Sequence, residues 1–207
     1  MTLMTVPIID ISSYWIGSEA SKRTVVHQID TACRDIGFLV IAGHGVPQEL
    51  VDEVDDVSRA FFDLPLQEKM RVLRPAPDVT RGYIPIEGES VARSRGENAP
   101  GDLNESLMIG PVDVGSDDYY TNSAAGKHFA PNLWPERPAA LREIYTAYYR
   151  AMSDLARTLM RLFALALDQP ETFFDDKIDK HISRLRVRNY PAPKISPQPG
   201  QLRAGAH

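Results

Sequence analysis

The 207-residue sequence predicts an α+β fold, and three patterns indicate it. Short β-type runs alternate with amphipathic helical stretches in the first third of the chain. A long helical stripe of apolar residues follows in the second half. Near the end, the run Leu185–Tyr190 alternates apolar and polar side chains with the period of a half-buried strand.

Composition excludes several classes of protein. A content of 43% hydrophobic and 25% charged residues is ordinary for a globular domain, and the net charge of -5 disfavours general nucleic-acid binding. The single cysteine, Cys33, excludes a disulfide framework, favours a cytoplasmic protein, and lies on an apolar helical stripe where a buried thiol is expected. We see no signal peptide in the sequence, and no apolar run approaches the roughly 20 residues that a membrane helix needs. No membrane partner is therefore expected.

The first part of the chain reads as strand, helix, strand, helix. Val6–Ile11 is a short β-type run, and Ser18 can cap the helix that follows. Phe38–Ile41 is a continuous apolar run, which is typical of a strand buried on both faces. The Gly43–Pro47 turn then leads into a second amphipathic helix.

The middle of the chain is less regular. Leu66–Leu73 reads as a short helix, and residues 75–130 are richer in Gly, Pro and Asp, with strand-like pieces at Gly82–Ile86 and Glu105–Ile109. Loops this long are often functional. Pro138 opens the longest helix.

The last stretch gathers the residues with the most chemistry. A further short helix at Glu171–Lys180 precedes the strand Leu185–Tyr190, and a proline-rich turn leads to a second strand-like run, Gln201–Ala206, and to His207. A tyrosine hydroxyl, a row of arginines and a histidine are thus expected on two neighbouring strands. Such a set can hold a metal and an anionic cosubstrate.

Seven short motifs follow one another in a characteristic order along nearly the whole chain. They are Pro7–Asp10, Asp35–Phe38, Gly43–Pro47, Phe61–Pro65, Arg81–Tyr83, Asn132–Pro135 and Asn189–Pro191. In order and spacing they resemble the isopenicillin N synthase-like family of non-haem Fe(II)/2-oxoglutarate-dependent oxygenases. The resemblance implies a distorted double-stranded β-helix, which is a jelly-roll barrel with flanking helices.

The resemblance also implies how the chain is divided. Residues 1–130 would form the N-terminal oxygenase region, with a variable substrate-side segment at about 75–130. Residues 131–180 would form the backing helices, and residues 181–207 the start of the barrel. Only the first barrel strands are expected, because the chain ends at the position of the first iron-ligand histidine.

His207 matches the first histidine of the family's His-x-Asp pair. On a strand, positions i and i+2 face the same way, so such a pair presents two ligands to one ion. Two histidines and one carboxylate leave open positions for cosubstrate and O₂, which suits Fe(II). The other ligands would follow His207, so the chain as given is expected to be catalytically incomplete, and no catalytic residue is assigned.

Two residues of the strand are expected to bind the cosubstrate. The resemblance places Tyr190 at the distal carboxylate of 2-oxoglutarate, with Arg188 beside it. Several relatives have an asparagine at the position of Arg188, so the arginine departs from the family pattern. Without the resemblance, Tyr190 reads as a half-buried packing aromatic and the arginines as a solvated strand face.

The substrate side is expected to include Arg186, as the contact for a carboxylate. Arg81, Tyr83 and Glu89 lie in the variable segment, and in the family the equivalent region lines the pocket mouth and selects the substrate. An ordinary solvated loop is an equal alternative for each of these residues.

The expected function is an iron-dependent dioxygenase that uses 2-oxoglutarate and O₂ to oxidise a small organic substrate, a carboxylic or amino acid derivative. Some relatives dispense with 2-oxoglutarate. The alternative is a non-catalytic scaffold or a truncated product that keeps part of the fold. A nucleotide-binding function is disfavoured because no glycine-rich phosphate loop follows a strand.

Overall fold

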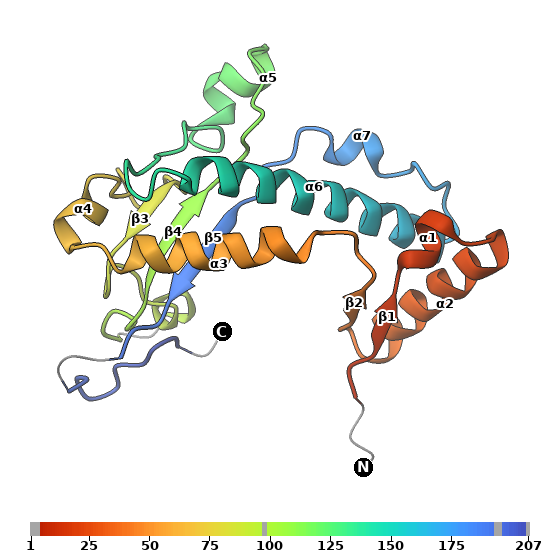
Figure 1. The fold of residues 1–207 in the computed structure, drawn as a ribbon, viewed down its shortest axis with the longest axis horizontal. Coiled ribbons are helices and arrows are strands. Elements are labelled where there is room, and N and C mark those ends of the chain that lie inside the picture. The colour runs from red at the N-terminus through yellow and green to blue at the C-terminus, as the bar shows by residue number, and fades with distance from the viewer. Residues whose placement is uncertain (1–4, 97–98, 193–195, 206–207) are drawn as a thin grey trace. The chain divides into compact units, whose positions relative to one another are not determined.

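The computed structural model describes residues 5–96, 99–192 and 196–205 (Figure 1). It confirms a mixed content of helices and strands. The chain forms two compact units of two segments each, Met1–Val51 with Arg150–His181 and Asp52–Tyr149 with Ile182–His207. Within the described ranges, no helix combines the length and the apolar character needed to cross a membrane.

The first unit is built on a small parallel sheet. Its strands β1 (Ile8–Asp10) and β2 (Val40–Ala42) pair with Ile9 opposite Ile41. Its helices are α1 (Ser12–Ile16), α2 (Glu19–Asp35), the later part of α6 (Leu141–Ala166) and α7 (Asp175–Ile178). Ser18 caps α2 as expected, because its hydroxyl accepts a hydrogen bond from the Ser21 amide at 3.2 Å. The core of this unit consists of Ile9, Ile11, Val25, Ile29, Ala32, Leu155 and Leu162.

Two expectations for this unit are wrong. The run Phe38–Ile41 is not buried on both faces, since Phe38 is 71% exposed and Val40 is 49% exposed. In this unit β2 pairs with β1 alone, so only part of its surface is covered. Cys33 is exposed because it lies one residue beyond the buried Ala32, on the outer side of α2.

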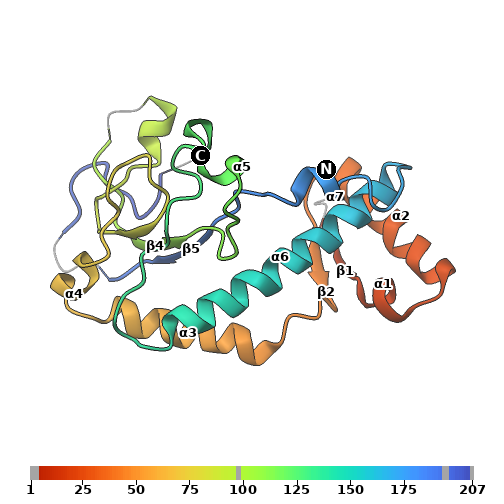
Figure 2. The same ribbon diagram turned by 90° about the horizontal axis from the view of Figure 1, so that it is seen from above.

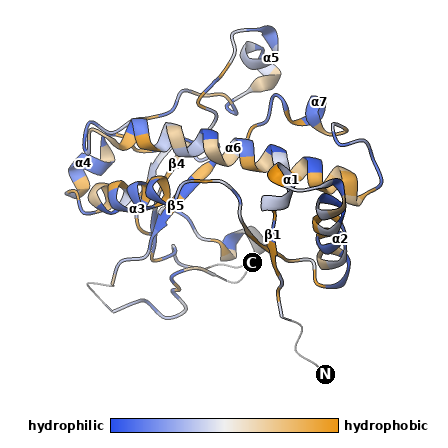
Figure 3. Cartoon of the chain, turned by 45° about the vertical axis from the view of Figure 1, so that its right-hand side comes forward, coloured by the Kyte–Doolittle hydropathy of each residue, from blue (hydrophilic) through white to orange (hydrophobic). Residues whose placement is uncertain are grey.

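The second unit is built on a three-stranded antiparallel sheet of order β3-β4-β5. The strands are β3 (Gly82–Ile84), β4 (Glu105–Ile109) and β5 (Leu185–Asn189), and Figure 2 shows β5 lying beside β4. The helical elements are most of α3 (Gln48–Phe62), α4 (Leu66–Met70), η1 (Ala92–Arg95), α5 (Asp118–Thr121), η2 (Ser123–Ala125) and the start of α6. Hydrophobic and hydrophilic residues alternate along α3 and α6 (Figure 3), as amphipathic helices require.

One face of this sheet packs into the core of the second unit. The buried residues come from α3, the turn after α4, the sheet and the start of α6. They are Val57, Phe61, Phe62, Val72, Tyr83, Leu107, Ile109, Leu141, Tyr145 and Tyr149. Leu185 and Val187 of β5 pack against this cluster. Burial raises the pKa of Tyr145 to about 12, and its hydroxyl lies 2.8 Å from that of Ser58.

The second strand expected near the end of the chain is absent from residues 201–205. This segment accepts a backbone hydrogen bond from the region before β4, from the Leu103 amide to the Leu202 carbonyl at 2.9 Å. One such bond does not build a strand ladder.

A buried ion pair fastens α4 to the sheet. The Lys69 ammonium donates to the Glu105 carboxylate at 2.8 Å and to the Phe62 carbonyl at 2.8 Å. The Tyr83 hydroxyl also donates to Glu105, and the Asn189 amide donates to it at 2.9 Å. Burial, and then the contact with Glu105, raises the pKa of Tyr83. We call Lys69, Tyr83, Glu105 and Asn189 the Glu105 cluster.

Removing one partner of a buried ion pair leaves the other charge unpaired. Glu105→Leu is therefore expected to lower the free energy of unfolding by about 3–5 kcal/mol in urea denaturation. The double variant Lys69→Met/Glu105→Leu should regain most of that loss, because it replaces the pair by apolar side chains. Arg59→Ala, which breaks an exposed ion pair with Asp55, serves as the control and should change stability little. Equal stability of Glu105→Leu and the unchanged protein would contradict a structural role for this pair.

Candidate functional site

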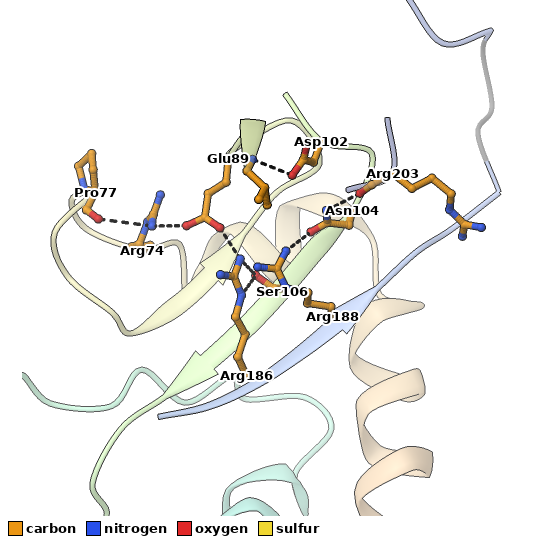
Figure 4. Close-up of polar contacts among 10 residues, drawn as sticks. Arg74, Pro77, Glu89, Asp102, Asn104, Ser106, Arg186, Arg188 and Arg203 are labelled. Atoms are coloured by element: carbon orange, nitrogen blue, oxygen red, sulfur yellow. Dashed lines mark hydrogen bonds and ion pairs between the residues drawn. The ribbon is translucent and has the colours of Figure 1, made fainter. Parts of the chain in front are cut away.

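Strands β4 and β5 divide their side chains between two faces of the sheet. Leu107 lies opposite Val187, and both belong to the core face. Ser106 lies opposite Arg188, and Met108 lies opposite Arg186. Because successive side chains point to opposite faces, the two arginines lie on the face away from the core. We call this the arginine face, and Figure 4 shows its polar residues Arg74, Glu89, Asp102, Asn104, Ser106, Arg186 and Arg188, with Arg203 contacting Asn104 through its carbonyl.

At one end of the arginine face, Glu89 bridges two arginines. The Arg74 guanidinium donates to one carboxylate oxygen at 2.7 Å, and Nη2 of Arg186 donates to the other. Arg186 also donates from Nε and Nη2 to the Ser106 hydroxyl at 3.1 and 2.9 Å. Burial opposes ionisation of Glu89, but the hydrogen bonds and charges of Arg186 and Arg74 outweigh it and lower the pKa. The carboxylate is therefore ionised at neutral pH, with both oxygens occupied.

At the other end, Arg188 has a neutral partner. Its Nη1 donates to the side-chain oxygen of Asn104 at 3.0 Å. Asn104 is buried and donates in turn to the Arg203 carbonyl at 2.7 Å, which fixes its orientation. Within residues 5–96, 99–192 and 196–205, Arg188 forms no ion pair. This guanidinium therefore keeps donors that an anion could use.

Tyr190 follows β5 directly and is 40% exposed. The Arg203 guanidinium carbon lies 5.5 Å from the centre of the tyrosine ring, and Nη2 of Arg203 donates to the Tyr190 carbonyl. Since the Arg203 carbonyl also binds Asn104, Arg203 connects Tyr190 with the Arg188 end of the face. The structure thus brings the two expected cosubstrate residues into one neighbourhood.

The expected iron ligand, His207, lies outside the described residues. Among the residues that the structure does describe, no three His, Cys, Asp or Glu side chains form a group that could hold a metal. These residues by themselves therefore do not fit an iron site, and the assignment of His207 stays a prediction. An anionic cosubstrate does fit, since Glu89 is shared by Arg74 and Arg186, and Arg188 hydrogen-bonds to the neutral amide of Asn104.

Arg81 and Tyr83 lie inside the second unit, each 1% exposed. Arg81 donates to the carbonyls of Thr80 at 2.8 Å and His128 at 2.5 Å, and burial lowers its pKa. Its guanidinium rests on Gly110, where an added Cβ would come within 1.9 Å of it. Tyr83 belongs to the Glu105 cluster. These contacts give both residues a structural role, and their substrate-binding roles stay predictions.

A cavity of about 810 Å³ lies on the core side of the sheet. The Glu105 cluster contributes part of its polar lining, together with Asp63, Glu87, Gln198 and Gln201, while Phe62, Leu64, Leu66, Pro85 and Leu103 supply apolar walls. Its size is typical of a ligand pocket. The cluster side chains already bind one another, so the cavity is a weaker candidate for an anion than the arginine face.

Sequence reasoning missed Arg74, Asn104 and Ser106. Asn104 and Ser106 alternate with Glu105 and Leu107, so a strand at Glu105–Ile109 already implies that they share a face. The partner strand and its register, which bring them against Arg188 and Arg186, are not visible in the sequence. No local signal pairs Arg74 with Glu89.

Comparison with known proteins identifies the family of this chain. Residues 6–137 match the family described as non-haem dioxygenase in morphine synthesis N-terminal. A 2-oxoglutarate-Fe(II) type oxidoreductase of Emericella nidulans is 34% identical over 206 residues, covering 97% of this chain and 57% of its own length. The validamycin A dioxygenase of Streptomyces hygroscopicus subsp. limoneus is 30% identical, covering 98% of this chain and 55% of its own length.

The fold agrees with a solved relative. A full-length Neurospora crassa protein in complex with alpha-KG superposes with a TM-score of 0.78 at 26% identity, over 98% of this chain and 60% of that one. The chain thus spans somewhat more than half the length of the relatives named here. Because the family match covers well over half of the 207 residues, the chain belongs to the non-haem dioxygenase family.

Proposed function

We propose that the protein is an isopenicillin N synthase-like dioxygenase that uses Fe(II), 2-oxoglutarate and O₂ to oxidise a small organic substrate. The observation that carries this proposal is the arginine face, where Arg188 is fixed by Asn104 but has no carboxylate partner among the described residues. The names of the relatives support it, since they include 2-oxoglutarate-Fe(II) oxidoreductases and a protein solved with alpha-KG.

The cosubstrate is a dicarboxylate, and the Arg188 end of the face can bind one of its carboxylates. The spare donors of the guanidinium suit a carboxylate, and Asn104 holds the side chain in place. The Tyr190 hydroxyl can donate a further hydrogen bond to the same anion. Iron, when bound, supplies the activation of O₂. His207 is our proposed ligand from this chain.

The substrate is proposed to be a small carboxylic or amino acid derivative. Arg74, Arg186 and Arg188 outnumber the carboxylates Glu89 and Asp102, so the face has a net positive charge, which attracts an anionic molecule. Glu89 and Arg186 are the residues of this face proposed to lie toward the substrate. The antiparallel pair β4-β5 is proposed to belong to a jelly-roll barrel, whose residues alternate between an outer core and an inner site.

The first test is turnover. We expect the protein expressed from its complete reading frame, supplied with Fe(II), to release succinate from 2-oxoglutarate. A panel of small carboxylic and amino acids, including uncharged amides, should contain compounds that increase this release and appear as oxidised products by mass spectrometry. Protein denatured by heat is the control. No succinate release from folded, iron-loaded protein across the panel would support a non-catalytic scaffold instead.

The second test measures cosubstrate binding. Arg188→Gln removes a charged hydrogen-bond donor, so the binding free energy of 2-oxoglutarate should weaken by about 1.5–3 kcal/mol in calorimetric titration. Tyr190→Phe should weaken it by about 0.5–3 kcal/mol. The matched control is Arg184→Gln, at an exposed arginine just before β5. If Arg188→Gln binds 2-oxoglutarate as Arg184→Gln does, Arg188 is not a cosubstrate residue.

A further inference from the structure

The charges of the arginine face are unevenly compensated. Arg74 and Arg186 share the carboxylate of Glu89, with their side chains only 15% and 22% exposed. Arg188, two residues along the same strand, binds the neutral amide of Asn104 instead. Figure 4 shows the Glu89 bridge at one end of the face and the Arg188–Asn104 contact at the other.

Arg186 is already committed to partners within the protein. Its Nε and Nη2 bind Ser106, which is fully buried, and Nη2 also binds Glu89. A ligand carboxylate that approached this edge would meet the ionised carboxylate of Glu89 and be repelled by it. Displacing Glu89 would also break its ion pair with Arg74.

We propose that Glu89 is a specificity-determining residue that reserves Arg186 and so directs anionic groups to the Arg188 end of the face. The substrate group that lies beside Glu89 is then neutral or cationic, and any substrate carboxylate lies away from Arg186. This rests on the proposed function only in taking the arginine face as the ligand-binding face. It refines the expectation that Arg186 itself binds a substrate carboxylate.

A purely structural role for Glu89 makes a different prediction. Glu89 fastens the chain after β3 to Arg74 and Arg186, and that alone stabilises the second unit. In that case the charge of a ligand would not matter to variants at position 89. Ligand charge is therefore the variable to test.

Benzoate, benzamide and benzamidine are suitable probes, because they share one planar framework and differ in charge. Their binding to the protein, free of iron and 2-oxoglutarate, can be followed by NMR titration. Benzoate binding should be lost in Arg188→Gln and only weakened in Arg186→Gln, by no more than the loss of one positive charge causes in Arg74→Gln. In Glu89→Gln, benzoate should bind about threefold to tenfold more tightly, because one negative charge on the same face is removed and Arg186 is released. Benzamide should bind equally to both proteins, and benzamidine more weakly to the variant.

Two further variants control for loss of stability and for the source of the gain in benzoate affinity. Adding Arg186→Gln to Glu89→Gln should abolish the gain in benzoate affinity. Arg74→Gln leaves Glu89 in place and removes a positive charge, so it should weaken benzoate binding by a similar factor; this variant still tests the proposal if Glu89→Gln does not fold.

Unchanged benzoate affinity in folded Glu89→Gln or folded Arg74→Gln would overturn the proposal. So would benzoate binding that depends on Arg186 as strongly as on Arg188. These titrations contain neither iron nor cosubstrate, so their failure is distinguishable from an absence of succinate release.

Discussion

The buried pair of Lys69 and Glu105 is the interaction on which the second unit depends. One carboxylate receives donors from α4, β3 and β5, and so fixes three elements around β4. The contact with Asn189 also sets the register of β5, because Glu105 lies opposite Asn189 in the ladder. A slip by one residue would move Arg186 and Arg188 to the core face and Val187 out of it. The charged cluster on one side of the sheet therefore determines which residues form the arginine face on the other.

The two faces of this sheet differ in the side chains they carry: one is apolar and packs into the core, and the other is polar. Leu107 and Val187 face an apolar core that tolerates little change in volume. Ser106 and Arg188, their immediate neighbours in the chain, lie on the face where polar side chains hydrogen-bond to one another. The same alternation supplies both, so a substitution in β4 or β5 acts on the core or on the proposed ligand-binding face according to whether its position is odd or even.

Much of this organisation is readable from the sequence, for physical reasons. The strand at Glu105–Ile109, the cap at Ser18 and the long helix opened near Pro138 depend on local pattern, and the structure has them where expected. The errors arise where burial depends on distant parts of the chain, as at Phe38 and Cys33. The arginines of the site follow from strand period and family resemblance. Their partners do not, because Glu89 meets Arg186 only once the fold brings together residues far apart in the sequence.

The packing of Arg81 on Gly110 has a consequence for how this protein can vary. Arg81 is buried and donates to two carbonyls, so moving its guanidinium aside for a side chain at position 110 would break these hydrogen bonds. Any residue larger than glycine there would overlap it. The two positions are therefore coupled: a side chain at position 110 is expected to be accommodated together with a shorter side chain at position 81.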